Sequence, residues 1–464
     1  MKYNICAIVR SAVTLVLILA SFVPYATAAG PVDTPGYWIK KIKAPDEIVM
    51  SPSEIEAFNK TVASQVGQMA EPGSMDGYVA GGDLLAWLLE EPLPSPEDGI
   101  RRFDLHGDEL TSQFLYEISA NMNIEWVEER NPVRFGVITE LTDVRAFPTD
   151  EPAFKGPSAG AFDMFQYSSV YPSEPVTLLH SSADGLWGFF QLRTVRGWIR
   201  LDKVAFGARS EAALQASQFI TITGNRVDVY SDMALSVRLA AVPMGTMLSL
   251  SGHDSGRPFK TGSPVGVSFP QRTLDGTIVW VDGYLDPKAD ISRGFLPYTR
   301  RNVITQAFKM LGEEYSWGGR DGNRDCSEFI KQVFASMGLR LPRNSGQQIR
   351  SGSVKAALKD GYATDDVKAA LRWADPGVTL VGMSGHIMLH IGERRGRQYV
   401  IHQVYGYKVG RRMKVVNRAE VTSLDIGKGT RSGPLKNRVR SVTEIIHRPT
   451  DKKISASGSQ GQKG

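Results

Sequence analysis

Residues 315–329 read Tyr-Ser-Trp-Gly-Gly-Arg-Asp-Gly-Asn-Arg-Asp-Cys-Ser-Glu-Phe, a glycine-rich loop that leads into an apolar segment. Cys326 stands where a helix is expected to begin, because apolar residues follow it at helical spacing as far as Met337, and Gly338 supplies a stop. Unpaired backbone N–H groups and the helix dipole stabilise an anion in a first turn, where a thiol pKa can fall from ~8.5 to roughly 3.5–7.5. The same N–H groups can donate to the oxyanion that forms when an amide is attacked. The position therefore predicts a nucleophilic cysteine.

The cysteine count supports a chemical role for this thiol. The chain has two cysteines, and Cys6 precedes an apolar run, Ala12 to Val23, that Pro24 and small residues follow. This layout is typical of a cleavable secretory signal, so we expect residues 1–28 to be removed together with Cys6. The run is shorter than the ~20 residues that a bilayer requires, so no stable membrane insertion is expected after cleavage. A single thiol in an exported chain has no disulfide partner, which favours catalytic use over a buried structural role.

A nucleophilic cysteine also needs a base. Three of the seven histidines, His386, His390 and His402, lie in two alternating runs that predict a β-hairpin with its tip near Arg395. If the hairpin is symmetric about that residue, His402 and His386 are diagonal neighbours on adjacent strands. Their Cα atoms are then ~7–8 Å apart, a distance at which the two imidazoles can touch. His390 lies on the same face of the strand as His386, so the spacing alone does not decide which of the two is the base. A zinc site is disfavoured because His-x3-His on a strand spreads the two rings ~13 Å apart, and no metal or other cofactor is expected.

The regions before the cysteine differ in their residue patterns. Residues 29–130 are predicted to form a helical arm, because residues 51–54 combine a capping box with proline at the first helical position. A second helix is expected over residues 108–122. The proline-rich stretch 91–96 between them favours an extended, wrapping arm over a bundle. Nothing in the arm suggests chemistry.

Between the arm and the cysteine region, short β-prone runs alternate with turns, which is typical of small barrels. An Asp-Gly turn precedes a tryptophan-bearing strand twice, at Trp187 and at Trp280, and Trp198 follows the first in a Gly-Trp-Ile strand. This pattern resembles bacterial SH3-like modules, more clearly over 131–206 than over 207–298. The resemblance implies modules that bind cell-wall peptide or pack on an enzyme. Trp187 and Trp198 are then either ligand platforms or, more commonly, barrel core.

The C-terminal part of the chain is basic. Thirteen Lys and Arg but only four acidic residues lie between Lys408 and Lys453, although the formal net charge of the whole chain is only +5. A basic segment of this kind forms either a solvated face or a surface that binds anionic partners. With export, an acidic cell-wall polymer or a carboxylate-bearing peptide fits better than nucleic acid, which is not expected as a partner. Residues 451–464 are expected to be a disordered tail.

The motifs around the cysteine and the histidines together resemble the NlpC-type cysteine peptidases of bacterial cell walls. They occur in order over about 300–405: Leu311-Gly312 to Tyr315, Trp317-Gly-Gly, Asp325-Cys326-Ser327, Leu341-Pro-Arg343 with Gln347, Gly385-His386, Ile391-Gly392 and His402. The resemblance implies an α+β, papain-like peptidase domain over 299–450. With the arm and the two barrels, the expected fold is multidomain: a helical arm, two small all-β SH3-like barrels and a C-terminal peptidase domain.

The resemblance also assigns roles. Cys326 becomes the nucleophile, His386 the general base and His402 the third polar residue that orients it. Tyr315 helps to shape the oxyanion and substrate site. Substrate-binding roles are implied for Asp325, Ser327, Trp317 and Ser384. Asp325 and Ser327 would recognise the amine end of a wall peptide, although helix capping explains these two residues equally well.

The whole arrangement looks like the larger family members, which resemble γ-D-glutamyl-L-diamino-acid endopeptidases. This implies hydrolysis of the γ-D-glutamyl–diaminoacid bond of peptidoglycan stem peptides or muropeptides, in the periplasm or outside the cell. The alternatives are a catalytically silent peptidoglycan-binding protein, and amidase or transpeptidase chemistry on the same Cys-His pair. Two positions depart from the family pattern: Glu328 replaces a glycine, and Val378 replaces an aspartate. Glu328 is expected to narrow the entrance or to change the charge near the diaminoacid.

Overall fold

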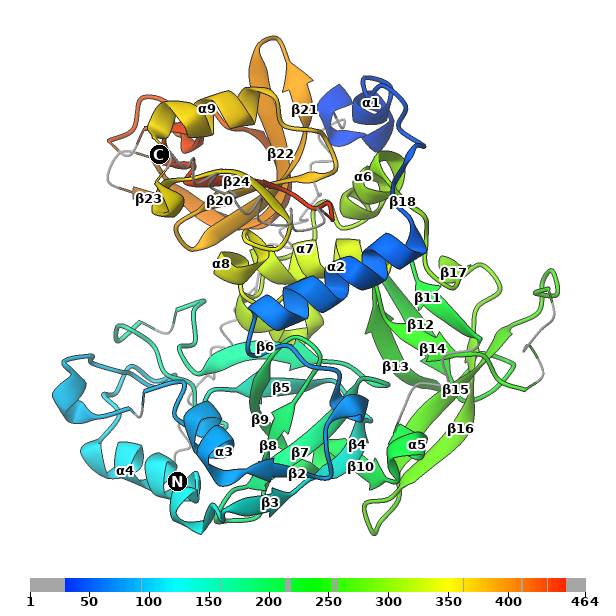
Figure 1. The fold of residues 1–464 in the computed structure, drawn as a ribbon, viewed down its shortest axis with the longest axis vertical. Helices are drawn as coiled ribbons and strands as arrows, with labels where there is room; N and C mark the ends of the chain where they lie inside the picture. The colour runs from blue at the N-terminus through cyan, green and yellow to red at the C-terminus, as the bar shows by residue number, and fades with distance from the viewer. Residues whose placement is uncertain are drawn as a thin grey trace, which may run out of the picture.

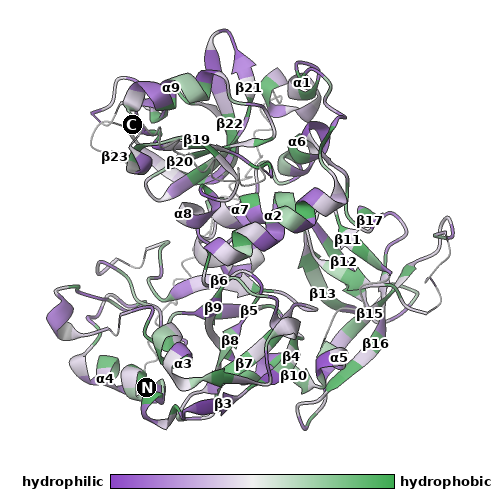
Figure 2. Ribbon diagram, viewed as in Figure 1, coloured by the Kyte–Doolittle hydropathy of each residue, from purple (hydrophilic) through white to green (hydrophobic). Residues whose placement is uncertain are grey.

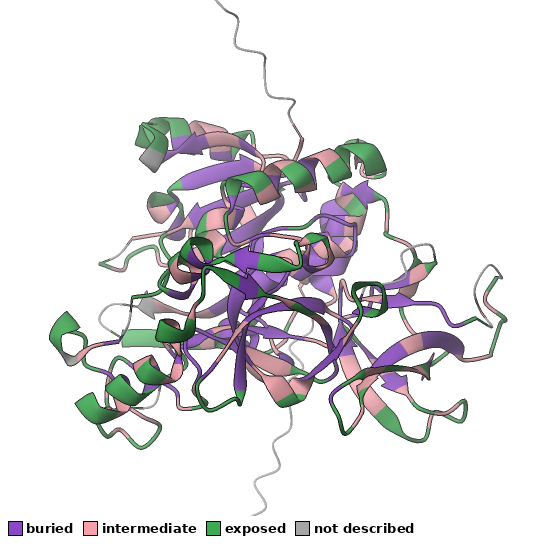
Figure 3. Cartoon of the chain, turned by 60° about the horizontal axis from the view of Figure 1, so that its bottom comes forward, coloured by how far each residue is buried: buried purple, intermediate pink, exposed green. Residues whose placement is uncertain are grey.

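The computed structural model describes residues 30–447, apart from residues 93, 159, 213–217, 253, 255–257, 362, 410–411 and 432. The predicted signal, 1–28, and the predicted tail, 451–464, lie outside these residues. Figure 1 shows the described regions meeting around helix α7 (Cys326–Ala335), with the C-terminal domain on one side of it and two β-rich regions on the other. Buried residues gather in the interior of the molecule, whereas the helices at its periphery carry exposed residues (Figure 3).

The N-terminal segment contains four α-helices that do not form a bundle. They are α1 (Pro35–Ile39), α2 (Pro52–Gln65), α3 (Gly81–Leu88) and α4 (Ser112–Asn121). Two short strand pairs accompany them: β1 (Ile48–Met50) with β18 (Tyr298–Thr299), and β2 (Tyr78–Ala80) with β3 (Arg130–Pro132). The predicted capping box is confirmed, since Ser51 and Glu54 bond each other's backbone N–H groups. The helix predicted from residue 108 begins instead at Ser112, because Thr111 caps it.

These helices connect the other regions. Polar and apolar residues alternate along α2 (Figure 2), and its buried Phe58 and Val62 join the core around α7. Trp38 of α1 joins the same core, whereas Leu84 of α3 and Ile118 of α4 pack on the first β-rich region. The segment therefore runs from the C-terminal domain to the first β-rich region.

The first β-rich region is one seven-stranded antiparallel sheet. Its order is β10-β4-β7-β8-β9-β5-β6, with bounds β4 (Arg134–Ile138), β5 (Thr142–Arg145), β6 (Gln166–Val170), β7 (Pro175–Ser181), β8 (Trp187–Gln191), β9 (Arg196–Arg200) and β10 (Val204–Gly207). Trp187 and Trp198 are 3% and 0% exposed and belong to its hydrophobic core. They are barrel core, so the alternative that they are ligand platforms is wrong.

The second β-rich region has two smaller sheets around a separate core. One contains β11 (Phe219–Ile222), β14 (Met247–Ser249) and β17 (Ile291–Arg293). The other contains β12 (Arg226–Tyr230), β13 (Arg238–Pro243), β15 (Val265–Arg272) and β16 (Ile278–Leu285). The short helix α5 (Arg209–Ala212) lies between the two regions, where Glu211 accepts a hydrogen bond from the Trp280 indole at 3.0 Å.

The C-terminal domain packs helices on a six-stranded antiparallel sheet. The helices are α6 (Arg300–Phe308), α7, α8 (Ser345–Gln348) and α9 (Thr364–Arg372). The sheet order is β19-β24-β20-β21-β22-β23, with bounds β19 (Ser353–Ala357), β20 (Thr379–Met383), β21 (His386–Arg394), β22 (Arg397–Val409), β23 (Arg412–Ser423) and β24 (Ser441–Glu444). No helix in the described part of the chain combines the length and the apolar character needed to span a membrane.

The predicted hairpin is confirmed as β21 and β22. Its tip pairs Arg394 with Arg397, and a bulge between His390 and Gly392 then changes the register to Leu389 opposite Ile401. The bulge makes the inner part of the hairpin symmetric about Arg395, as expected. Buried apolar residues of α7 and of this hairpin share one core, which fixes the helix against the sheet.

Candidate active site

Cys326 begins α7, as predicted. The side chain of Asp325 caps the helix and accepts hydrogen bonds from the backbone N–H groups of Ser327 and Glu328 at 3.0 and 2.8 Å. The cysteine is 6% exposed, and the backbone of Ile387, the residue after His386, lies close enough to lower the pKa of its thiol. Helix α7 and the start of β21 thus bring the thiol beside the first strand residue of the hairpin.

Burial raises the pKa of the Cys326 thiol to about 12, and the Asp325 carboxylate adds to the rise. Backbone hydrogen bonds from Ile387 and Ser327 and the charge of Arg343 oppose this rise, but they are smaller. The lowered thiol pKa expected from a first-turn position is therefore wrong for the resting site, because desolvation outweighs the helix terminus. The thiol is neutral at rest.

Two of the three histidines of the hairpin, His386 and His402, are in contact. Nε2 of His386 lies 2.7 Å from Nδ1 of His402, and Nε2 of His402 lies 3.0 Å from Oγ1 of Thr422 on β23. His390 points elsewhere, since its Nε2 lies 2.7 Å from Oε1 of Gln398. The structure thus brings His386, and not His390, together with His402, and the catalytic roles of the two residues stay predictions.

Both imidazoles of this pair are neutral near neutral pH. Burial lowers the pKa of His386 to about 4, with the positive charge of Arg438 as the second cause. Burial and the neighbouring His386 hold the pKa of His402 well below its usual value. In one tautomer, His402 donates to Thr422 and His386 donates to His402, which leaves Nδ1 of His386 free to accept a proton.

An aromatic cluster lies next to the thiol and joins two regions of the chain. Phe162, from a loop of the first β-rich region, packs with ring centroids 6.3, 5.2 and 4.9 Å from Tyr315, Trp317 and Tyr405. The Trp317 indole N–H donates to the carbonyl of Asp163 at 2.9 Å. Burial, followed by the Asp325 charge, raises the pKa of the Tyr315 phenol, which therefore remains a hydrogen-bond donor.

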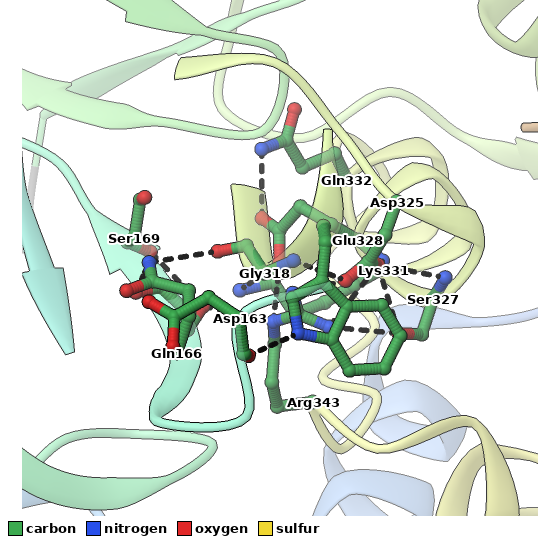
Figure 4. A network of polar contacts seen from close by, with 12 residues as sticks. Asp163, Gln166, Ser169, Gly318, Asp325, Ser327, Glu328, Lys331, Gln332 and Arg343 are labelled. Atoms are coloured by element: carbon green, nitrogen blue, oxygen red, sulfur yellow. Dashed lines mark hydrogen bonds and ion pairs between the residues drawn. The ribbon is translucent and has the colours of Figure 1, made fainter. Parts of the chain in front are cut away.

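A network of hydrogen bonds and ion pairs holds the Asp325 side chain in place (Figure 4). Arg343 donates to its Oδ1 at 3.2 Å and to its Oδ2 at 2.6 Å, and also donates to Ser327 Oγ at 2.7 Å and to Ser168 Oγ at 2.8 Å. Oδ2 also accepts the backbone N–H of Gly318 at 3.1 Å. The capping role of Asp325 is confirmed, and its oxygens are already occupied. Recognition of a substrate amine by Asp325 and Ser327 stays a prediction.

The first β-rich region is in close contact with the loop that precedes Cys326. Gly318, in the 3-10 segment η6 (Trp317–Gly322), has φ +65°, and an added Cβ would lie 2.3 Å from Cγ of Gln166. Only glycine suits both this backbone conformation and this approach. The Trp-Gly-Gly motif is therefore also a contact between domains.

Glu328 does not narrow the entrance, contrary to expectation. It is 3% exposed, and one carboxylate oxygen forms ion pairs with Lys331 and Arg343, at 3.0 and 3.2 Å. Its other oxygen accepts from Gln332 at 2.7 Å. Neighbouring cations hold the carboxylate inside the protein, so it cannot alter the charge in the substrate path.

The remaining predicted substrate-binding residues, Ser384 and Trp317, are more exposed than the rest of the site. Ser384 is exposed in the turn between β20 and β21, two residues before His386. Trp317 is 36% exposed. In the described part of the chain, no group of three or more His, Cys, Asp or Glu side chains is arranged to hold a metal ion.

Three residues of the site had not been identified from the sequence: Thr422, Phe162 and Arg438. Because β22 pairs His402 with Glu420, Thr422 is a diagonal neighbour of His402, but this register depends on a third strand beyond the predicted hairpin. Phe162 comes from an irregular loop of another region, and no local pattern marks it. Arg438 was noticed only as part of the basic C-terminal region.

Comparison with known proteins identifies the class to which this site belongs. Residues 312–414 match the NlpC/P60 family, and residues 152–200 match an SH3 domain of the SH3b1 type. The chain therefore contains a domain of the NlpC/P60 family, whose members are cysteine peptidases and hydrolases, and an SH3 domain ahead of it.

Among curated relatives, the probable endopeptidase p60 of Listeria innocua is 52% identical over 50 residues, which are 11% of this chain and 11% of that protein. The gamma-D-glutamyl-L-lysine dipeptidyl-peptidase of Bacillus subtilis is 35% identical over 72 residues, 15% of this chain and 22% of that protein. The matches thus span about a tenth to a fifth of these relatives. A solved NlpC/P60 endopeptidase from Photobacterium damselae subsp. piscicida has the same fold, with a TM-score of 0.68 at 18% identity over 89% of this chain and 97% of that chain.

Proposed function

We propose that this protein hydrolyses the γ-D-glutamyl–diaminoacid amide bond of peptidoglycan stem peptides through a thioester on Cys326. The observation that carries the proposal is the chain of groups from the thiol region through His386 and His402 to Thr422, with contacts of 2.7 and 3.0 Å. The bond specificity is supported by the likeness to the Bacillus subtilis gamma-D-glutamyl-L-lysine dipeptidyl-peptidase.

In the first step, Sγ of Cys326 attacks the γ-D-glutamyl carbonyl carbon while its proton passes to Nδ1 of His386. The thiol pKa of about 12 makes a free thiolate rare at rest, so proton transfer accompanies attack. The imidazolium that forms is held by its Nε2–H bond to His402. We assign the oxyanion to two donors, the first-turn N–H of Cys326 and the hydroxyl of Tyr315.

In the second step, His386 gives its proton to the leaving amine and the thioester is formed. A water molecule then attacks the thioester carbonyl and loses its proton to His386, which returns it to the sulfur as the acid is released. Both steps use the same imidazole, so the free Nδ1 must face the sulfur throughout the cycle.

Substrate access is proposed to be limited by the SH3 domain. Phe162 and Gln166 from that region contact the aromatic cluster and the loop before Cys326. Such a cover favours short, free stem peptides over cross-linked wall, and therefore turnover rather than lysis. We also propose that the second β-rich region is an SH3-like module and that residues 1–28 are an export signal.

Mass spectrometry of L-Ala-γ-D-Glu-diaminopimelate after incubation with the protein and with its Cys326→Ala variant tests this function. Release of L-Ala-γ-D-Glu by the unaltered protein only is the expected result. Cleavage at another amide would indicate an amidase, and a new, longer peptide a transpeptidase. Binding to wall material without any cleavage would indicate a peptidoglycan-binding protein.

A further inference from the structure

A pocket of about 340 Å³ is lined by residues just before His386 in the chain, and Ser384 is the one lining residue with a role implied by the sequence. Met383 and Ser384, at the turn before His386, form one wall, and residues 437–440, between η8 (Leu435–Arg438) and β24, form another. None of the lining residues comes from either β-rich region. Phe162 of the SH3 domain lies on the aromatic cluster next to the thiol. The pocket is therefore separate from the part of the site that the SH3 domain contacts.

The pocket carries positive charge for which the described part of the chain supplies no acidic partner. Arg438 and Arg440 both line it, and its lining contains no acidic residue. Nε of Arg438 is buried and has no hydrogen-bond partner among the described residues. The adjacent Lys436 contrasts with it, since its Nζ lies 2.6 Å from Asp425.

An unpaired, partly buried guanidinium costs free energy unless a ligand supplies the missing acceptor. Its planar array of N–H donors matches a carboxylate, which it can hold through two parallel bonds. The exposed hydroxyl of Ser384 and the side-chain amide of Asn437 line the same pocket and can donate further bonds. The arrangement therefore suits an anion with a carboxylate group.

The pocket is also close enough to the reacting groups to serve the substrate. The charge of Arg438 is the second cause of the lowered pKa of His386, after burial. Ser384 is separated from that histidine by one residue. A group held here would lie next to the imidazole that protonates the leaving amine.

We propose that this pocket binds the side-chain carboxylate of the diaminoacid leaving group, with Arg438 as its principal partner. The inference rests on the proposed function and adds a substrate preference to it. Diaminopimelate ends its side chain in a carboxylate beside an amine, whereas lysine ends in an amine alone. Two arginines attract the first and repel the second, so the protein selects diaminopimelate peptides.

The test compares kcat/KM for three tripeptides, L-Ala-γ-D-Glu followed by diaminopimelate, by side-chain-amidated diaminopimelate, or by lysine. The unaltered protein is expected to prefer the first by about 10–100-fold, the range that charge-assisted hydrogen bonds supply. Arg438→Gln should reduce that preference to about threefold or less, and Arg440→Gln should reduce it partly. Lys436→Gln, a neighbour outside the pocket, should retain the full preference.

The ratio between substrates separates recognition from any effect of Arg438 on His386, because a changed imidazole alters all three rates alike. Equal rates on the three peptides, or a loss in Arg438→Gln that is the same for all of them, would overturn the subsite and leave the proposed function standing.

Calorimetric binding of the same peptides to Cys326→Ala gives a reading that does not need turnover. If the unaltered protein cleaves none of them, selective binding of the diaminopimelate peptide that Arg438→Gln abolishes would keep the subsite and reject the hydrolase. Binding without selectivity would reject the subsite.

Discussion

Acid should destabilise this protein through the histidine beside the thiol. Burial and Arg438 lower the pKa of His386 from 6.5 to about 4 in the folded chain. Between these values the unfolded state binds a proton that the folded state excludes, so the stabilisation is complete above pH ~6.5 and is lost as the pH falls toward about 4. At 1.36 kcal/mol per pKa unit, the loss is about 2.5 kcal/mol at pH ~4.5. This is an upper value, because the His386 side chain is only partly buried.

Urea unfolding at pH ~7.5 and ~4.5 measures this loss, with His386→Gln as the variant that cannot titrate. The unaltered protein should lose up to about 2.5 kcal/mol more than His386→Gln over this interval. His106→Gln removes an exposed histidine of the arm and should follow the unaltered protein. Equal losses in the unaltered protein and in His386→Gln would refute the conclusion that the imidazole is held neutral by burial.

Three further outcomes follow from the site. Thr422→Val should lower kcat about fivefold by removing the hydroxyl that bonds His402, and Thr422→Ser should restore it; an unchanged kcat in the valine variant would show that this bond does not position the imidazole. Arg343→Met leaves Asp325 buried without its cation and should lower the free energy of unfolding by about 3–5 kcal/mol in urea titrations, whereas a loss under ~1 kcal/mol would contradict a closed ion pair. Because burial raises the pKa of Cys326 to about 12, the ultraviolet thiolate absorbance, taken as the difference from Cys326→Ala, should be absent between pH ~7 and ~9. A plateau of that absorbance below pH ~8 would instead reveal a resting thiolate.

The local patterns predicted the elements that carry the site. Helical spacing after Cys326 placed the thiol in a first turn, and strand alternation placed His386 and His402 on one face of a hairpin. The diagonal contact depended on register, which a bulge between His390 and Gly392 adjusts. A bulge of this kind is hard to recognise in a sequence. The assumption that the hairpin is symmetric about Arg395 therefore gave the correct pairing, although it did not predict the bulge that produces the pairing.

Properties that arise from contacts between domains could not be predicted in this way. The raised thiol pKa depends on burial, and Phe162 and Ser168 reach the site from a separate sheet. The inward direction of Glu328 follows from Arg343, fifteen positions later in the chain. Composition and spacing describe neighbours along one element, whereas these contacts exist only after the domains have packed.

The most direct test of the central claim is to trap the intermediate. Rapid acid quenching of the protein with L-Ala-γ-D-Glu-diaminopimelate, followed by peptide mapping, should show L-Ala-γ-D-Glu attached to the peptide that contains Cys326, and Cys326→Ala should show neither adduct nor hydrolysis. Hydrolysis that persists in Cys326→Ala would contradict the assignment of this thiol as the nucleophile.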